Sequence, residues 1–223
     1  MQQAVQRVII APRAAPTALV STVTSNSTPA PKIPAITVGL RPFDPASDGD
    51  APSAVSALLV TFSARPGGGA RFVFTLEGRL GDLRLPEADA PPADPLWQHT
   101  CFEAFLSAPG EEGYYEYNFS PAGPWAGYRF QRYRECAGGL EDEAVIAPPV
   151  IVCERRDGVL MLETDLPSTL LPPSPVLRIG LAAVVERRDG HLEYWAVSHP
   201  AKQPDFHHAS GWTLELDTRS IAQ

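Results

Sequence analysis

Apolar residues alternate with smaller or polar ones over 58–62 and again over 72–76, and the glycine-rich segment 65–69 separates these two runs. Alternation at every second position places one set of side chains on each face of a strand. Two such strands joined by a short turn predict a β-hairpin.

Two more hairpins are predicted in the C-terminal half, where the same five residues, Glu-Arg-Arg-Asp-Gly, occupy 154–158 and 186–190. Each copy lies between two apolar runs, and Asp-Gly favours a tight turn because glycine tolerates positive φ angles. Between these hairpins, residues 165–173 contain three prolines, which limit them to a loop or one short helical turn.

The rest of the sequence gives little indication of helices. A 3.6-residue periodicity is almost absent, and the 24 prolines weigh against long helices because each one removes a backbone donor. Many short strands with regular turn signals favour a sandwich over a parallel sheet. We therefore predict an all-β fold, a two-sheet antiparallel β-sandwich with immunoglobulin-like or jelly-roll-like layers.

Residues 1–35 differ from the rest of the chain in composition. They are rich in Ala, Pro, Ser and Thr and contain no aromatic residue, so they cannot bury enough surface to offset the entropy of ordering. We expect a flexible, disordered tail there, followed by one β-sandwich domain over residues 36–218. Residues 43–52 carry turn-forming residues at nearly every position, and we expect a linker-like stretch before the first clear strand.

The net charge and the cysteine content of the chain limit the kinds of partner and the cellular compartment that we expect. A formal net charge of -8 and a pI near 5.1 disfavour nucleic acid, because binding to phosphates depends on clustered Lys and Arg. Three scattered cysteines are too few for a disulfide framework, which favours a reducing compartment. No run approaches the roughly 20 apolar residues of a membrane helix, and the N-terminus lacks a convincing export signal. We expect a cytoplasmic protein that binds neither nucleic acid nor a membrane.

The segment from Asp94 to Arg134 holds eleven of the nineteen aromatic residues of the chain. Alternation over 100–106 places Glu103 opposite the apolar face of its strand, and alternation over 115–120 does the same for Glu116 and Asn118. If these two strands pair, the three polar side chains form a row on one face of the sheet. The residues expected beside this row, from the next strand, are Trp125, Tyr128 and Arg132.

Such a row has two interpretations. Carbohydrate sites stack apolar sugar faces on aromatic rings while carboxylate, amide and guanidinium groups bind the hydroxyls, so the row is typical of a sugar site. Aromatic strands also pack cores, and carboxylates and Arg pair across sheets for purely structural reasons. The alternative is therefore a structural or protein-interaction β-sandwich without a small-molecule ligand.

Several separated runs carry a resemblance to a known family. They are 96–106 (LWQHTCFEAFL), 115–121 (YEYNFSP), 125–130 (WAGYRF), Tyr133-Arg134, and 194–200 (YWAVSHP) followed by 204–208 (PDFHH). Together they resemble bacterial DOMON-like domains, in particular the subgroup similar to family 9 carbohydrate-binding modules that is found beside or fused to the UDP-N-acetylenolpyruvoylglucosamine reductase.

This resemblance spans about residues 55–217 and carries expectations about fold and function. It implies a two-sheet sandwich with a noncatalytic role in binding a sugar or, in other branches of the superfamily, haem. Family 9 modules clamp a sugar between two tryptophans. The chain has four tryptophans, and the sequence does not match any two of them to that clamp; they are Trp97, Trp125, Trp195 and Trp212.

The segment 199–208 gathers three histidines and an acid in a region that two prolines keep irregular. We expect His199, Asp205 and His207 to lie at the rim of a ligand site, since binding groups often lie on loops held by a rigid scaffold. A metal site using these residues, or His208, is a weaker alternative because the spacing matches no standard zinc pattern. Haem ligation would depend on Met161 or on two histidines, and no cofactor is predicted.

No self-sufficient catalytic motif is present. Glu103 and Glu116 are the simplest pair for a glycosidase, which needs two carboxylates, but acid pairs arise on sheets for ordinary reasons. The favoured interpretation is a noncatalytic module for a carbohydrate or a sugar-derived small molecule. Its candidate ligand-binding residues are Trp97, Glu103, Asn118, Trp125, Tyr128, Arg132, His199, Asp205 and His207.

Overall fold

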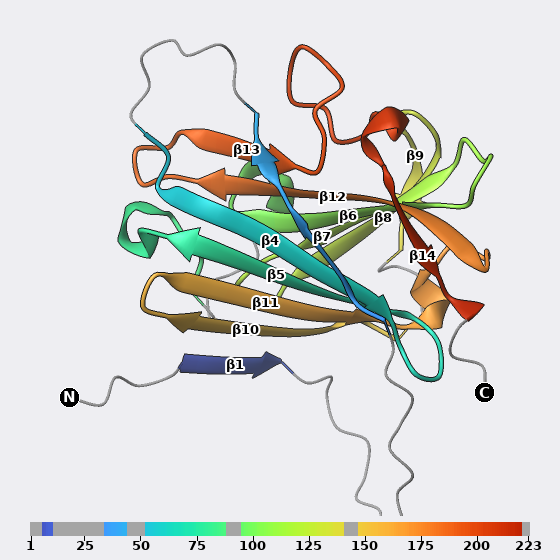
Figure 1. Cartoon of the computed structure of the whole chain (residues 1–223), viewed down its shortest axis with the longest axis horizontal. Coiled ribbons are helices and arrows are strands. Elements are labelled where there is room, and N and C mark those ends of the chain that lie inside the picture. The colour runs from blue at the N-terminus through green and yellow to red at the C-terminus, as the bar shows by residue number, and fades with distance from the viewer. Residues whose placement is uncertain (1–5, 11–33, 44–51, 88–94, 141–146, 220–223) are drawn as a thin grey trace, which may run out of the picture.

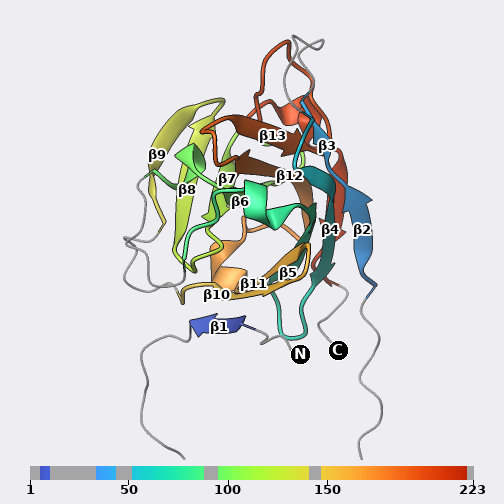
Figure 2. The same cartoon turned by 90° about the vertical axis from the view of Figure 1, so that its left-hand side faces the viewer.

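The fold is a sandwich of two antiparallel β-sheets (Figures 1 and 2). It was obtained as a computed structural model, which describes residues 6–10, 34–43, 52–87, 95–140 and 147–219. Within these ranges the helical segments are four short 3₁₀ turns, which are η1 (Leu80–Asp82), η2 (Leu96–Gln98), η3 (Ser168–Leu170) and η4 (Ala209–Gly211). The predicted all-β sandwich is confirmed, and none of the described helices is long and apolar enough to cross a membrane.

The first sheet has six strands. In spatial order they are β1 (Gln6–Ile10), β10 (Val150–Arg156), β11 (Val159–Leu166), β5 (Ala70–Gly78), β4 (Val55–Ala64) and β2 (Ile36–Gly39). The predicted hairpin over 58–76 is the β4–β5 pair, and the first Glu-Arg-Arg-Asp-Gly hairpin is the β10–β11 pair. Gly158 adopts a φ of 72° in the second of these turns, the left-handed conformation that its position after Asp indicated.

The second sheet has eight strands. Seven lie in the order β3 (Arg41–Pro42), β13 (Leu192–Ala196), β12 (Val176–Glu186), β6 (Cys101–Ser107), β7 (Tyr114–Phe119), β8 (Trp125–Arg132) and β9 (Glu135–Gly139). The eighth, β14 (Leu214–Asp217), pairs with the first half of β12. The second Glu-Arg-Arg-Asp-Gly hairpin is β12–β13, and η3 is the short helical turn expected within 165–173.

The N-terminal region is only partly described. Residues 6–10 form β1, which runs antiparallel to β10 with Val8 opposite Cys153, at the edge of the first sheet (Figure 1). These five residues of the expected tail are therefore a strand. The rest of that tail up to residue 33, and most of the linker-like stretch at 44–51, lie outside the described residues. The boundaries of the tail and the domain stay predictions.

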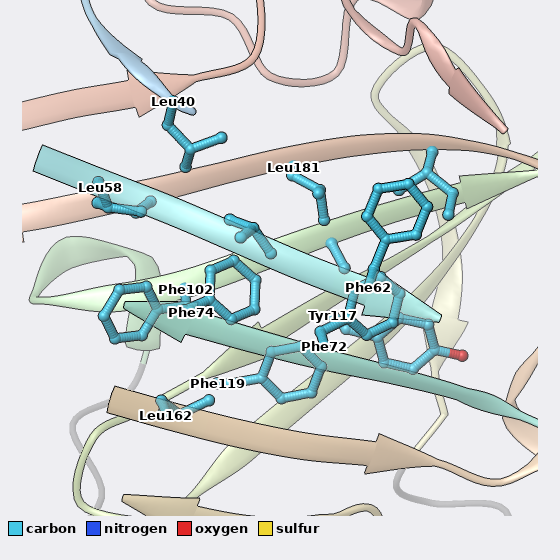
Figure 3. Packing of buried hydrophobic residues seen from close by; sticks show 14 of the residues in the cluster. Leu40, Leu58, Phe62, Phe72, Phe74, Phe102, Tyr117, Phe119, Leu162 and Leu181 are labelled. Carbon is cyan, nitrogen blue, oxygen red and sulfur yellow. The ribbon is translucent and has the colours of Figure 1, made fainter. Parts of the chain in front are cut away.

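The core lies between the two sheets and consists of the inward-facing members of the alternating strands (Figure 3). Phe72 and Phe74 of β5 face Phe102 of β6 and Tyr117 and Phe119 of β7, and all five are buried. Burying such rings is worth roughly 1.5–3 kcal/mol each, so this layer fixes which side of β6 and β7 faces inward. The opposite side of these strands is the outer face of the second sheet.

Candidate functional site

The polar row predicted from alternation lies on the outer face of the second sheet. Glu103 of β6 pairs directly with Asn118 of β7, and Glu116 of β7 pairs with Tyr128 of β8. Directly paired residues point to the same side of a sheet, so these four side chains share the face opposite the core. Glu103, Glu116 and Asn118 are nonetheless almost fully buried, which means that other groups cover this face.

A pocket of about 460 Å³ opens over this row, a volume within the range of small-molecule sites. It is bounded by η2, by the outer faces of six strands of the second sheet, and by the β13–η4 loop (residues 197–208). Its lining residues are Trp97, Glu103, Glu116, Tyr128, Phe130, Arg134, Cys136, Val184, Tyr194, Pro204, Phe206 and His207. The floor carries two carboxyl groups and the walls are mainly aromatic.

Four of the nine candidate residues line this pocket, namely Trp97, Glu103, Tyr128 and His207. Trp97 is 49% exposed, so its ring is available at the mouth. Asn118 lies beneath the lining, where its Nδ2 donates a 2.7 Å hydrogen bond to Oε1 of Glu116. Asp205 is one layer behind the lining and accepts a 3.0 Å bond from the guanidinium of Arg134.

Three candidates lie elsewhere. Trp125 packs against the core between the sheets, because it is three residues from Tyr128 and an odd separation places two strand residues on opposite faces. Arg132 is exposed at the end of β8 and pairs with Glu135 at 2.6 Å. His199 donates from Nε2 to the Arg41 carbonyl at 2.9 Å and lies edge-on to Phe43. None of the three lines the pocket, which corrects their expected place beside the polar row or at its rim.

The two carboxyl groups of the floor have unusual electrostatics. Burial raises the pKa of Glu103 well above its ordinary value, and the charge of Glu116 raises it further, while a hydrogen bond from the Cys101 thiol opposes this change. Burial likewise raises the pKa of Glu116, although the Asn118 amide and the charge of Arg134 counteract it. Since two adjacent buried carboxylates repel each other, the pair retains a proton at a pH where exposed carboxyl groups are ionised.

His207 lies on the β13–η4 loop and contacts the second sheet as a neutral ring. Burial lowers the pKa of His207 to about 4, with a further contribution from the charge of Arg134 that Asp205 partly offsets, so the ring is neutral at pH 7. The Tyr114 hydroxyl accepts a 3.1 Å bond from the Arg134 backbone N–H and lies 2.7 Å from Nδ1 of His207. The other ring nitrogen of His207, Nε2, lies 3.7 Å from Oε2 of Glu116.

Arg134 is the pocket residue that alternation could not find. It lies in the β8–β9 turn with a φ of 56°, a left-handed value that no other non-glycine residue of the described ranges adopts. Its guanidinium pairs with Asp205 and covers the Tyr133 ring at 5.7 Å, while the Tyr133 hydroxyl also donates to Asp205. A strained turn residue held by several contacts is common at functional sites. The Tyr133-Arg134 pair within the family resemblance was the one available signal.

An aromatic cluster holds the β13–η4 loop against the sheet. Trp212 stacks on Phe105 with ring centroids 6.0 Å apart, over Gly180, where a Cβ atom would come within 2.1 Å of the indole. The indole N–H donates to the Phe206 carbonyl at 2.9 Å, which places Phe206 in the pocket wall. The loop is thus fixed against the sheet by packing.

The residues considered for metal or haem ligation are not brought together among the described residues. In the described ranges, no group of three or more His, Cys, Asp or Glu side chains is placed to hold a metal ion. His199, Asp205 and His207 point to different partners, and His208 bonds to Ser210. Met161 lies on β11 in the other sheet, away from the pocket.

Comparison with known proteins supports the fold. No protein-family profile matches the sequence, and no curated protein matches it. A similar solved structure is that of a "putative carbohydrate-binding protein" from Bacteroides uniformis, with a TM-score of 0.52 and 16% sequence identity over 79% of this chain and 84% of that chain. At this identity the likeness establishes a shared fold, and function must be inferred from the pocket itself.

Proposed function

We propose that the protein is a noncatalytic module that binds a small carbohydrate or a sugar-derived molecule in the pocket on the outer face of the second sheet. The observation that carries this proposal is the composition of the pocket, a polar floor of Glu103 and Glu116 beneath aromatic walls. The sequence resemblance to DOMON-like domains similar to family 9 carbohydrate-binding modules, and the name of the Bacteroides uniformis neighbour, point in the same direction.

The pocket offers both kinds of contact that sugars require. Trp97, Tyr128 and Tyr194 present rings against which the apolar face of a pyranose can stack. The carboxyl groups of the floor and the Arg134 guanidinium can bind hydroxyl groups in fixed directions. A volume of about 460 Å³ accommodates a mono- or disaccharide and favours a small ligand over a long glycan chain.

The pocket also favours ligand binding over a purely structural role. A polar row that served only the sheet would be closed by cross-strand partners, whereas here two carboxyl groups line an open cavity. All three cysteines are free and Cys136 is exposed at the pocket, which supports the proposal of a reducing, cytoplasmic setting.

A glycosidase is the second candidate function, because the buried pair Glu103 and Glu116 lies within the pocket and retains a proton. One protonated and one ionised carboxyl group are the requirement for hydrolysis of a glycosidic bond. We place it second because both groups are buried and lie on one face of the sheet, whereas glycosidases need two carboxyl groups that flank the scissile bond.

Isothermal titration calorimetry with mono- and disaccharides, including cell-wall amino sugars, tests the proposal. We expect millimolar or tighter binding of at least one sugar, a loss of about tenfold or more in Tyr128→Ala, and no change in Glu112→Gln, which lies on an exposed turn. Absence of binding by every sugar at millimolar concentration would overturn it. Release of reducing sugar from a nitrophenyl glycoside, abolished in Glu103→Gln, would favour the glycosidase instead.

A further inference from the structure

The carboxyl group of Glu103 in the pocket floor has few hydrogen-bond partners within the described part of the protein. Glu103 is 3% exposed, and the hydrogen bond that it receives from the described residues is a long one from the Cys101 thiol, at 3.5 Å. Among the described residues, the donor to the Glu103 carboxyl group is this thiol, and Glu103 lines the pocket floor. Buried carboxyl groups normally have charged or multiple partners, so the Glu103 carboxyl group can take a further partner from a ligand in the pocket.

The cation that lines the pocket, Arg134, acts on Glu116 but is shared with another carboxylate. Arg134 lines the pocket, but its charge is paired with Asp205 at 3.0 Å and its guanidinium covers Tyr133. His207 faces Glu116 as a neutral ring. The titratable and charged groups that face the pair from all surrounding elements are Cys101, Tyr114, Tyr128, Arg134, Cys136, Tyr194, Asp205 and His207.

The walls above the floor are suited to a cation. The rings of Tyr128, Phe130, Tyr194 and Phe206 surround the cavity, with Trp97 at its mouth. The faces of aromatic rings attract ammonium groups, and this attraction strengthens where water is excluded. Acidic groups at the bottom and aromatic rings around the side together form a site for a protonated amine.

We propose that the ligand carries a free, protonated amino group that binds between Glu103 and Glu116, while the rest of the molecule contacts the aromatic walls. The ligand class is therefore an amino sugar, or a similar aminopolyol, whose nitrogen is not acylated. This inference rests on the proposed function, since it specifies the kind of sugar that the same pocket binds.

Binding of such a ligand displaces a proton. Before binding, burial and the repulsion between the two negative charges raise the pKa values of the pair and favour a protonated carboxyl group. The ammonium group stabilises both carboxylates in the ionised form, and the displaced proton passes to solvent. Apart from the carboxyl O–H bond that gives up its proton to solvent, no covalent bond forms or breaks. The net charge of the complex is lower by one than the summed charges of the free protein and the protonated ligand.

Calorimetry with three matched probes, D-glucosamine, N-acetyl-D-glucosamine and D-glucose, tests this inference near pH 6.5. We expect glucosamine to bind about tenfold more tightly than the other two. Its binding enthalpy should differ between phosphate and HEPES buffers, as proton release requires. The tenfold preference should disappear in Glu103→Gln and persist in the exposed control Glu112→Gln. The ligand comparison needs no variant, so it decides the question even if Glu103→Gln does not fold.

Other outcomes separate the inference from the proposed function. Equal affinity for the three sugars, or tighter binding of glucose or N-acetylglucosamine, overturns the inference and leaves the proposed function standing. Binding of putrescine that Glu103→Gln abolishes, with no binding of any sugar, overturns the sugar function and supports an amine site. Failure of all four probes to bind overturns both.

Discussion

The Tyr114 hydroxyl lies 2.7 Å from Nδ1 of His207, and this contact joins β7 to the loop that walls the pocket. The same hydroxyl accepts the backbone N–H of Arg134 at 3.1 Å. One oxygen thus positions the β8–β9 turn and the β13–η4 loop relative to the carboxyl pair. Because Tyr114 itself is 2% exposed and stacks on Phe130, the whole arrangement is anchored in a packed cluster.

Removing that oxygen tests its role. Tyr114→Phe keeps the ring and leaves Nδ1 of His207 and the Arg134 N–H without their partner, which costs about 1–3 kcal/mol for buried groups. We expect this loss of unfolding free energy in urea titrations. Tyr115→Phe, on the same strand but with no hydroxyl hydrogen bond in the described structure, is the matched control. Equal effects of the two substitutions would contradict a bridging role for Tyr114.

The pKa of His207 predicts how stability depends on pH. The pKa falls from an unfolded value of 6.5 to about 4, so the unfolded chain takes up a proton first as the pH decreases. Stability contributed by the neutral ring is complete above about pH 6.5 and is lost towards pH 4, by about 3 kcal/mol. Urea titrations at several pH values should show this loss, reduced in His207→Gln. Parallel curves for the two proteins would refute the assignment.

The close packing of Trp212 on Gly180 predicts that a larger residue at position 180 will clash with the indole. An alanine at position 180 would place its Cβ 2.1 Å from the indole, so the ring and the loop attached to it must move. We expect Gly180→Ala to lower stability by about 1–3 kcal/mol and to change the near-ultraviolet circular dichroism of the tryptophans. Gly81→Ala is the control, because no atom lies within 4 Å of its added Cβ. A neutral Gly180→Ala would show that the loop is not held by this packing.

The energetic cost of the left-handed backbone conformation at Arg134 can be measured by comparing two substitutions that remove the same side chain. Arg134→Gly relieves the conformation, whereas Arg134→Ala keeps it, and left-handed geometry costs an L-residue roughly 1–2 kcal/mol. We expect the glycine variant to be more stable by about 1 kcal/mol in urea titrations. At Arg132, on the adjoining strand, the order should reverse, because glycine weakens a strand. The same order at both positions would count against strain at Arg134.

Much of the fold could be predicted because alternation and turn chemistry are local. The hairpins around residues 65–69, 154–158 and 186–190 all follow from apolar runs on either side of glycine-containing turns. Alternation also predicted correctly that Glu103, Glu116 and Asn118 face away from the core. Edge strand β1 was missed because its pairing with β10 joins segments about 145 residues apart in sequence, which no local pattern reveals.

The candidate site could be predicted less completely. The prediction that Trp125 lies beside Tyr128 is wrong, because the two residues are three positions apart and strict alternation assigns Trp125 to the core side. Arg134 belongs to a turn, where side-chain direction depends on a φ angle that the sequence does not fix. His199 and Asp205 occupy an irregular loop whose path is set by tertiary contacts such as Trp212 on Phe105. The local sequence therefore could not predict which loop residues reach the pocket.

The opposite faces of β6 and β7 have a consequence for how this protein can diversify. Phe102 and Tyr117 hold the two sheets together, while their immediate neighbours Glu103 and Glu116 form the pocket floor. In these two strands, the residues that stabilise the fold alternate with the residues that line the pocket. A descendant or a designed library can vary the outward positions to recognise a different molecule while every inward position, and with it the architecture, is retained.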